Sequence, residues 1–189
     1  MTTTATTTYP RTISDGGSEE LTWMGIEHDP ERGEVLKVRN RVAPGGGPPM
    51  HTHLRQSEEL TVEEGTIAWE IAGDPTEHRA GPGETVSFEP GVSHRFWNAG
   101  EDTLVCEGGI WPPDNIEYFL TQIYESTARN GGKRPGLFDS AFLTRHFRSE
   151  FRMDEIPAIA TKVVIPIVAR VGRLLGRDKR FANAPASVS

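Results

Sequence analysis

The sequence has a single cysteine, no long apolar run and no excess of basic residues, and each absence excludes a class of protein. Cys106 has no partner with which to form a disulfide within the chain, and a lone thiol is typical of a reducing compartment. No apolar run approaches the roughly 20 residues that a membrane-spanning helix needs. Residues 1–8 are threonine-rich and lack the basic start and apolar stretch of a secretory signal. We therefore expect a cytoplasmic protein without a transmembrane segment.

The charge and the composition further limit the classes of partner and of fold. Acidic residues outnumber basic ones by 27 to 20, which gives a formal net charge of −7 and argues against a nucleic-acid partner. The length of 189 residues allows one domain with an appendage. The 20 glycines and 14 prolines favour many short strands joined by turns over a helical bundle.

The middle of the chain alternates in the manner of β-strands. In residues 35–42, Leu36, Val38 and Val42 share one face and basic side chains occupy the other, which is typical of a half-buried strand. Turn signals at 73–75 and 81–83 separate further short segments of this kind. The pattern predicts a sandwich or barrel over residues 21–113, with strands that include 35–42, 66–72, 85–88, 94–98 and 103–107.

Beyond Pro113 the apolar period becomes helical. Asp114 and Glu117 form a capping-box pattern, which predicts a first helix that ends near Asn130. Asp139 is placed to cap a second, shorter helix, and the third is expected over residues 157–175. The predicted organisation is therefore a disordered tail over 1–20, a barrel over 21–113, a helical extension over 114–180 and a flexible end over 181–189.

The third predicted helix carries an apolar stripe beside basic residues. We expect this stripe to pack on the barrel or on a second subunit, although a basic amphipathic helix can also lie on an anionic membrane surface. A lone small barrel leaves sheet edges to protect, so we expect a homodimer. The stripe consists of Ala160, Val163, Val164, Ile167, Val171 and Leu174, and the basic residues are Lys162, Arg170, Arg173 and Arg177.

Three histidines and one glutamate have spacings that suit a metal ion. His51 and His53 are two residues apart, so on a strand both imidazoles point to the same side. Glu58 follows after a short piece that must bend the chain, and His94 must come from another strand of a closed or folded sheet. Three imidazoles and a carboxylate suit one divalent ion of Fe, Mn, Co, Ni, Cu or Zn, with positions left open for a substrate.

The same residues resemble the paired motifs of the cupin superfamily. From Gly45 the chain matches the first motif, G-x5-H-x-H-x4-E-x6-G, in full. From Gly83 it matches the second, G-x5-P-x-G-x2-H-x3-N, except that Glu89 stands where the motif has proline. The resemblance covers residues 35–111. It implies a mainly β fold, a double-stranded β-helix (jelly-roll) cupin barrel, here with a C-terminal helical extension, and it implies the metal ligands His51, His53, Glu58 and His94.

Aromatic residues of the predicted strands are candidates for the substrate pocket. Small barrels place aromatic walls around an interior site, so we expect Phe96, Trp69 and Phe88 to belong either to the core or to that pocket. Phe96 is the strongest candidate because it shares the parity of His94 on one strand.

The function that we predict is that of a metal-dependent cupin enzyme, a dioxygenase or oxidase that acts on a small enol, phenol or diol. Among cupins with three histidines and a glutamate, the chain is similar in pattern to small quercetin-dioxygenase-like proteins. Glu58 is expected to be both a ligand and a catalytic base. Two alternatives stay open: a metal-assisted isomerase, lyase or cyclase without redox chemistry, and a barrel that binds a small ligand without catalysis.

Overall fold

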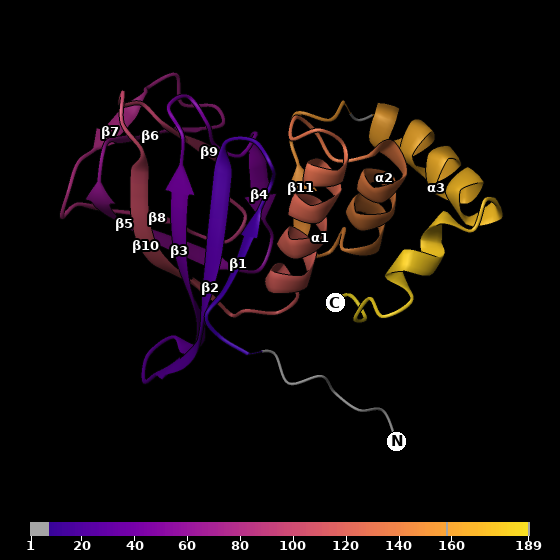
Figure 1. The fold of residues 1–189 in the computed structure, drawn as a ribbon, viewed down its shortest axis with the longest axis horizontal. Helices are drawn as coiled ribbons and strands as arrows, with labels where there is room; N and C mark the ends of the chain where they lie inside the picture. Colours follow the sequence, from indigo (N-terminus) through magenta and orange to yellow (C-terminus); the bar gives the residue numbers. More distant parts are fainter. Residues whose placement is uncertain (1–7, 158, 189) are drawn as a thin grey trace.

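Two antiparallel sheets form a β-sandwich, and a group of helices stands beside it (Figure 1). The computed structural model describes residues 8–157 and 159–188. The larger sheet has the order β1-β2-β3-β10-β5-β8 and the smaller one β11-β4-β9-β6-β7. The strands are β1 Arg11–Ser14, β2 Glu19–Asp29, β3 Gly33–Val42, β4 His51–His53, β5 Ser57–Glu64, β6 Ile67–Ile71, β7 His78–Ala80, β8 Thr85–Phe88, β9 Ser93–Asn98, β10 Leu104–Trp111 and β11 Phe151–Met153.

This arrangement is the double-stranded β-helix that the sequence predicted. The alternation in β3 is confirmed, because Leu36, Val38 and Val42 are all buried while Arg41 is exposed. Strand β10 lies between β3 and β5, and its Ile110 is opposite Leu36 on one side and Glu58 on the other. In the smaller sheet His51 on β4 is directly opposite His94 on β9. The register alone therefore brings two of the predicted ligands together.

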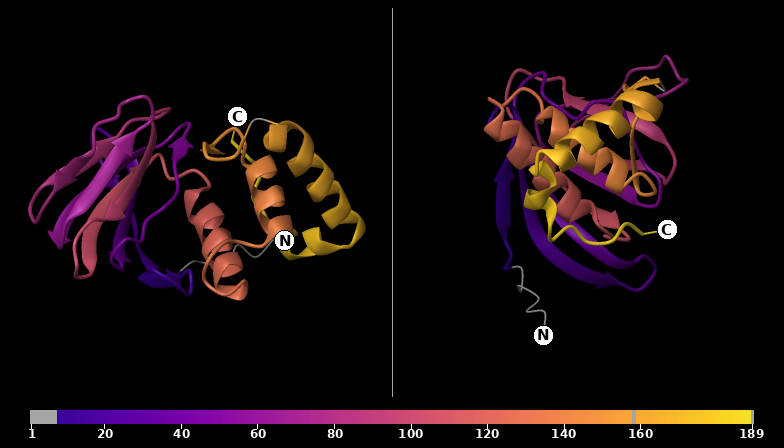
Figure 2. Two further views of the ribbon diagram at one scale, coloured as in Figure 1. Left: turned by 90° about the horizontal axis from the view of Figure 1, so that it is seen from above. Right: turned by 90° about the vertical axis from the view of Figure 1, so that its right-hand side faces the viewer.

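The helical part follows β10 and lies against one side of the sandwich (Figure 2). It comprises α1 Ile116–Arg129, α2 Leu137–His146, a π-helical turn Ala160–Val164, α3 Ile165–Leu174 and a 3₁₀ turn Arg177–Phe181. Helix α1 is nearest to the sandwich. Its Ile116 and Phe119 share a core cluster with Trp23 of β2 and Leu36 of β3, while a second core cluster lies within the sandwich.

Helix α3 is the outermost element and packs on α2. At their contact Gly172 lies so close to Phe138 that an added Cβ would come within 2.8 Å of the phenyl ring. The apolar stripe faces away from this contact, since Ile167 is 58% exposed and Leu174 is 81% exposed. The stripe therefore does not meet the barrel, from which α1 and α2 separate it, and its packing on a second subunit stays a prediction. None of the described helices is both long and apolar enough to cross a membrane.

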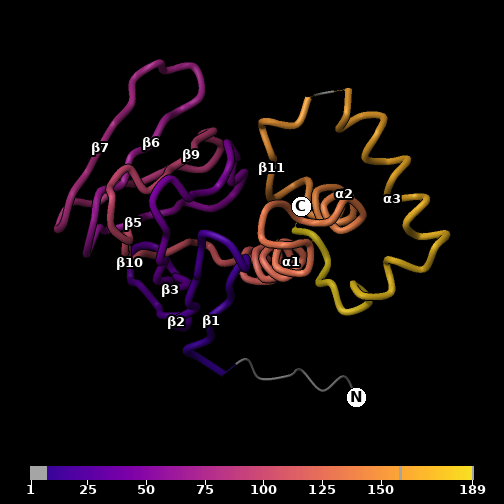
Figure 3. Tube along the Cα trace, turned by 45° about the horizontal axis from the view of Figure 1, so that its top comes forward, coloured from indigo at the N-terminus to yellow at the C-terminus, as the bar shows by residue number. Residues whose placement is uncertain are grey.

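Strand β11 joins the helical part to the smaller sheet. It follows α2 in the chain and lies beside the helices in space, yet it pairs antiparallel with β4 (Figure 3). Phe151 is opposite His53, and Met153 is opposite His51. A segment about one hundred residues away in the sequence thus forms the edge next to the histidine strand.

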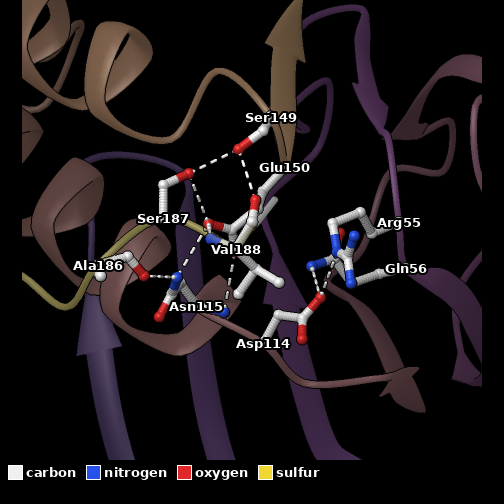
Figure 4. A network of polar contacts seen from close by, with 9 residues as sticks. All are labelled: Arg55, Gln56, Asp114, Asn115, Ser149, Glu150, Ala186, Ser187 and Val188. Atoms are coloured by element: carbon white, nitrogen blue, oxygen red, sulfur yellow. Dashed lines mark hydrogen bonds and ion pairs between the residues drawn. The ribbon is translucent and has the colours of Figure 1, made fainter.

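Both ends of the described chain differ from the expectation of free tails. Strand β1 pairs with β2 and buries Ile13, so residues 11–14 belong to the larger sheet, while residues 1–7 lie outside the described part. At the other end, Glu150 is fully buried and its carboxylate accepts hydrogen bonds from Ser187 Oγ and Val188 N (Figure 4). Buried acceptors and apolar side chains hold both segments in place.

The start of α1 also departs from the prediction. Asn115 is the N-cap residue, and it makes no side-chain capping bond. Asp114 instead pairs with Arg55 at 3.0 Å, in the bend between β4 and β5 (Figure 4). Glu117 pairs with Arg11 at 2.9 Å. The capping box is absent from the helix because both of its acidic residues bind side chains that are distant in the sequence.

Candidate metal centre

Three short strands supply the four predicted ligands. His51 and His53 come from β4, Glu58 from β5 and His94 from β9. The parity prediction for His51 and His53 is confirmed, since one ligand atom from each of the four residues lies within 4.8 Å of all the others. Except for the half-buried His51, these side chains are buried.

The imidazoles present their Nε2 atoms to a common point. The Nδ1 atoms of His51 and His94 lie 2.8 Å and 3.0 Å from the carbonyl oxygens of Pro49 and Val92. A carbonyl oxygen can only accept, so each Nδ1 carries the proton and, in the neutral ring, leaves a lone pair on Nε2. This is the orientation that metal-ligating histidines require.

The distances between the ligand atoms fit a single ion. Nε2 of His51 lies 3.1 Å from Nε2 of His53, and Oε2 of Glu58 lies 3.3 Å from Nε2 of His94. Ligand bonds of about 2.1 Å at right angles place neighbouring donors about 3 Å apart. Lone pairs that face one another at this separation repel unless a cation or a proton lies between them. The donor set therefore fits a divalent first-row transition metal.

Burial sets the protonation states that an ion would need. Burial lowers the pKa of His53 to about 3, so the ring is neutral at pH 7. For Glu58, burial alone would raise the pKa, but the interactions with His94, His53 and His51 outweigh it and lower the pKa to about 2. The centre thus offers neutral imidazole and an ionised carboxylate.

His53 is held differently from the other two histidines. Its Nδ1 is buried and has no hydrogen-bond partner among the described residues. Its ring instead meets the ring of Phe151 on β11 edge to face, with centroids 5.8 Å apart. Packing by an aromatic neighbour therefore takes the place of the carbonyl that orients the other rings.

A second set of contacts fixes β4 between its neighbours. Asp154, just after β11, accepts hydrogen bonds from Thr52 on β4 and from Ser93 on β9, the latter at 2.8 Å. Thr52 lies between the two ligand histidines, and Ser93 precedes the third. One carboxylate from the helical part thus clamps the two strands that carry the imidazoles.

The centre opens into a cavity of about 310 Å³ between the sandwich and the helical part. Most of its wall is apolar. From the sandwich it includes Leu21, Val38, Phe96 and Ile110, and from the helical part Ile116, Phe119, Leu120, Ile123, Phe151, Met153 and Ile156. His51, His53 and Glu58 form a polar part of the wall, and other polar groups include Glu19, Asn40, Arg152 and Glu155. A molecule of moderate size can therefore reach three of the predicted ligands in a chamber that the helices help to enclose.

The predicted pocket aromatics separate into two groups. Phe96 lines the cavity. Phe88 does not line it, because its ring stacks on His94 at a centroid distance of 3.8 Å and lies behind the histidine. Trp69 does not line it either, because it stacks on His78 at 5.2 Å near the far edge of the smaller sheet. Phe88 belongs to a core cluster of the sandwich and Trp69 packs against it, which is the core position that was the other expectation for them.

The comparisons with known proteins agree with this geometry. A family model described as a cupin domain matches residues 38–111, which include all four predicted ligands. Residues 38–111 thus form a cupin domain. No curated protein matches the chain.

Several solved structures are similar to part of the chain. KdgF from a Halomonas species is 18% identical, with 52% of this chain and 85% of that chain covered and a TM-score of 0.43. A sugar phosphate isomerase of the cupin superfamily from Silicibacter pomeroyi is 19% identical, with 50% and 59% covered and a TM-score of 0.41. A mutant oxalate decarboxylase from Bacillus subtilis is 14% identical, with 50% and 26% covered and a TM-score of 0.41. At these values the similarities carry no argument about the reaction.

Two residues of the chamber were missed by the sequence analysis. Phe151 lies in a three-residue strand that has too little sequence for an alternation to show. Asn40 had a visible signal, because it has the same parity as Leu36, Val38 and Val42 and is the one polar residue in that row.

Proposed function

We propose that this protein is a metal-dependent oxidoreductase, a dioxygenase or oxidase, that acts on a small ring-bearing enol, phenol or diol. The observation that carries the proposal is the convergence of three Nε2 atoms and the Glu58 carboxylate, of which His51, His53 and Glu58 line a mostly apolar cavity. Such a cavity favours a ligand that is apolar over most of its surface and polar at the end that meets the ion.

The four predicted ligands have distinct tasks in this proposal. His51, His53 and His94 would hold the ion, and Glu58 would complete the set with a negative charge. A bound redox-active ion supplies the electron transfer with O2 and the polarisation of the substrate oxygen. Phe96 and the apolar wall orient the ring and exclude water.

Glu58 is also placed to accept a proton from the substrate. Its carboxylate lies on the cavity wall, so one oxygen can accept a proton from an enol or phenol hydroxyl whose acidity a bound ion would raise. The Glu58→Gln variant keeps the shape and loses the basic oxygen. We expect it to retain part of its metal and to lose at least 100-fold in turnover. Full turnover with full metal content would exclude the role as base.

The test of the metal centre is elemental analysis of protein purified without a histidine tag. We expect near-stoichiometric Fe, Mn, Ni, Cu or Co in the wild type and its loss in His51→Ala and His94→Ala. His78→Ala is the matched control, since His78 lies outside the cluster and is partly exposed. No metal in any preparation, even after reconstitution, would refute the proposal.

Oxygen uptake then separates redox from non-redox chemistry. Enols, catechols and flavonols are the first compounds to screen, with dissolved O2 followed by an electrode. We expect uptake that depends on both the substrate and the metal. Zinc in the centre, together with turnover that consumes no O2, would instead assign a Lewis-acid isomerase, lyase or cyclase.

We also propose that the protein is a homodimer. The support is the exposed apolar stripe on the π-helical turn and α3, which a second copy would cover. Sedimentation velocity is expected to give a dimer for the wild type and a monomer for Val171→Asp. A wild type that sediments only as a monomer would refute this proposal.

A further inference from the structure

Glu19 is an acidic residue in the mostly apolar wall of the chamber. It begins strand β2 and shares the parity of Leu21 and Trp23, whose side chains are buried. Alternate residues of a strand point to the same side, so Glu19 is directed to the inner face of the larger sheet. Glu19 and Leu21 both line the chamber. The metal centre does not use this carboxylate, so its presence in the wall needs an explanation of its own.

The contacts of Glu19 leave half of its carboxylate available. Tyr124 on α1 donates its hydroxyl to Oε2 of Glu19 at 2.8 Å, and Tyr124 lines the chamber as well. Within residues 8–157 and 159–188, Oε1 of Glu19 makes no hydrogen bond. The described side-chain atoms that are both enclosed and unpartnered belong to four other residues, so Oε1 keeps accessible surface. A ligand in the chamber can therefore meet this oxygen.

The charge of Glu19 has no counter-ion. None of the described basic side chains forms an ion pair with it or contributes to its pKa. Burial raises the pKa of Glu19 although the hydrogen bond from Tyr124 lowers it, and the charge of Asp15 raises it further. Burial also raises the pKa of Tyr124 well above its usual value, and so do the charges of Glu19, Asp15 and Glu58. The pair therefore lies in a negative field that extends to the metal-binding carboxylate.

The charges along the chamber wall do not balance one another. Glu19, Glu58 and Glu155 are acidic, whereas Arg152 is the one lysine or arginine among the described lining residues. Arg152 forms an ion pair with Asp154, which lies outside the wall. The lining histidines are neutral when they act as metal ligands. A divalent ion would offset Glu58 and one further charge, so the wall attracts a positive group even with the centre filled. A surrounding of low dielectric constant strengthens that attraction.

We infer that Glu19 is a specificity-determining residue that binds a protonated amine of the substrate, with Tyr124 as its positioning residue. The inference rests on the proposed function in taking the chamber as the substrate site, and it names a substrate class, a ring-bearing enol or phenol that also carries an ammonium group. The apolar wall would hold the ring, and Oε1 of Glu19 would accept a hydrogen bond from the ammonium group. A neutral apolar group in that place would leave the carboxylate desolvated and without compensation.

The test compares two probes of nearly the same shape, the cation 1-naphthylmethylamine and the neutral 1-naphthalenemethanol. Equilibrium dialysis at pH 7 measures their affinities for the chelator-treated full chain, so that the amine cannot bind to a metal. A hydrogen bond to a charged group corresponds to about tenfold in affinity or more. We expect the wild type to prefer the amine by at least about tenfold and Glu19→Gln to lose this factor. Glu20→Gln, at the exposed next position of β2, is the matched control and should keep the preference.

The neutral probe separates ligand binding from a structural role, in which Glu19 would only tie β2 to α1. Glutamine keeps the size and can still accept the hydrogen bond from Tyr124. Glu19→Gln should therefore bind 1-naphthalenemethanol as the wild type does and melt at the same temperature or higher, since a desolvated charge is removed. Weaker binding of the neutral probe, or a lower melting temperature, would show that Glu19 supports the fold and would overturn the inference.

The amine probe locates the binding site. A wild type without the preference, or a preference that persists in Glu19→Gln, would also overturn the inference. Persistence in Glu19→Gln together with loss in Glu58→Gln would place the amine at the metal centre instead. These measurements need neither metal nor turnover, so their failure is distinguishable from a failure of the proposed function.

Discussion

Replacing Phe151 by alanine tests whether the helical part supports the metal centre. Phe151 is 6% exposed, stacks on Phe119 at 4.5 Å and touches the ring of His53. Removal of a buried phenylalanine costs about 3–5 kcal/mol of unfolding free energy. Phe151 also borders the cavity and so lacks neighbours on one side, which places the expected loss at the lower end, about 3 kcal/mol.

The effect on metal binding follows from the orientation of His53. Its Nδ1 has no hydrogen-bond partner among the described residues, so the phenyl ring is the contact that limits rotation of the imidazole. Loss of such support beside a ligand weakens metal binding by about 10–100-fold. We expect about tenfold, because two of the three histidines keep their carbonyl partners.

Two assays measure these quantities separately. Urea unfolding of chelator-treated protein gives the free energy of unfolding, and competition with a chromogenic chelator gives the metal affinity. Leu137→Ala, at a position that is 64% exposed, is the control and should change neither. An unchanged unfolding free energy would show that β11 is not packed as described. A destabilised protein with wild-type metal affinity would refute the link between β11 and the centre.

Two further predictions concern the clamp at Asp154 and the contact between α2 and α3. Burial would raise the pKa of Asp154, but hydrogen bonds from Thr52, Arg152 and Ser93 lower it below its usual value. The ionised Asp154 carboxylate therefore stabilises the fold fully above the unfolded pKa of about 3.9, and this stabilisation is lost as the pH falls through the lower, folded pKa. At pH 6 the wild type should have a higher melting temperature than Asp154→Asn. The two melting temperatures should converge as the pH falls below about 4 and through the folded pKa. Equal melting temperatures at pH 6 would contradict the clamp. Gly172→Val should destabilise by about 1–3 kcal/mol in urea, because the new side chain meets the Phe138 ring, and wild-type stability would contradict that contact.

The sandwich and the four-residue cluster were predictable because their signals are local. His51 and His53 share a face by strand parity, and the alternation of β3 extends over most of its length. The motif spacing then implied that Glu58 and His94 join them. Periodicity of this kind depends only on neighbouring residues, so one sequence is enough to reveal it.

The remaining features depend on partners that are distant in the sequence. Strands β1 and β11 have four and three residues, which are too few to show an alternation of apolar and polar side chains. Each is a strand because it pairs with a neighbouring strand, β2 for β1 and β4 for β11. The capping box failed because Asp114 and Glu117 bind side chains more than fifty residues away. The part of the cavity wall that the helices form was not predicted for the same reason. A local sequence pattern does not indicate against which other element a helix will pack.

The order of the elements along the chain has a consequence for how the centre is assembled. All four predicted ligands are synthesised before residue 95, whereas Phe151, Asp154 and the segment that binds Glu150 come much later. Domains fold N-terminal part first as the chain is synthesised. The histidines can therefore meet while one side of the chamber is still open to solvent. Less protein then surrounds the ligands, so we expect metal incorporation during synthesis to be faster than uptake by the folded, metal-free chain.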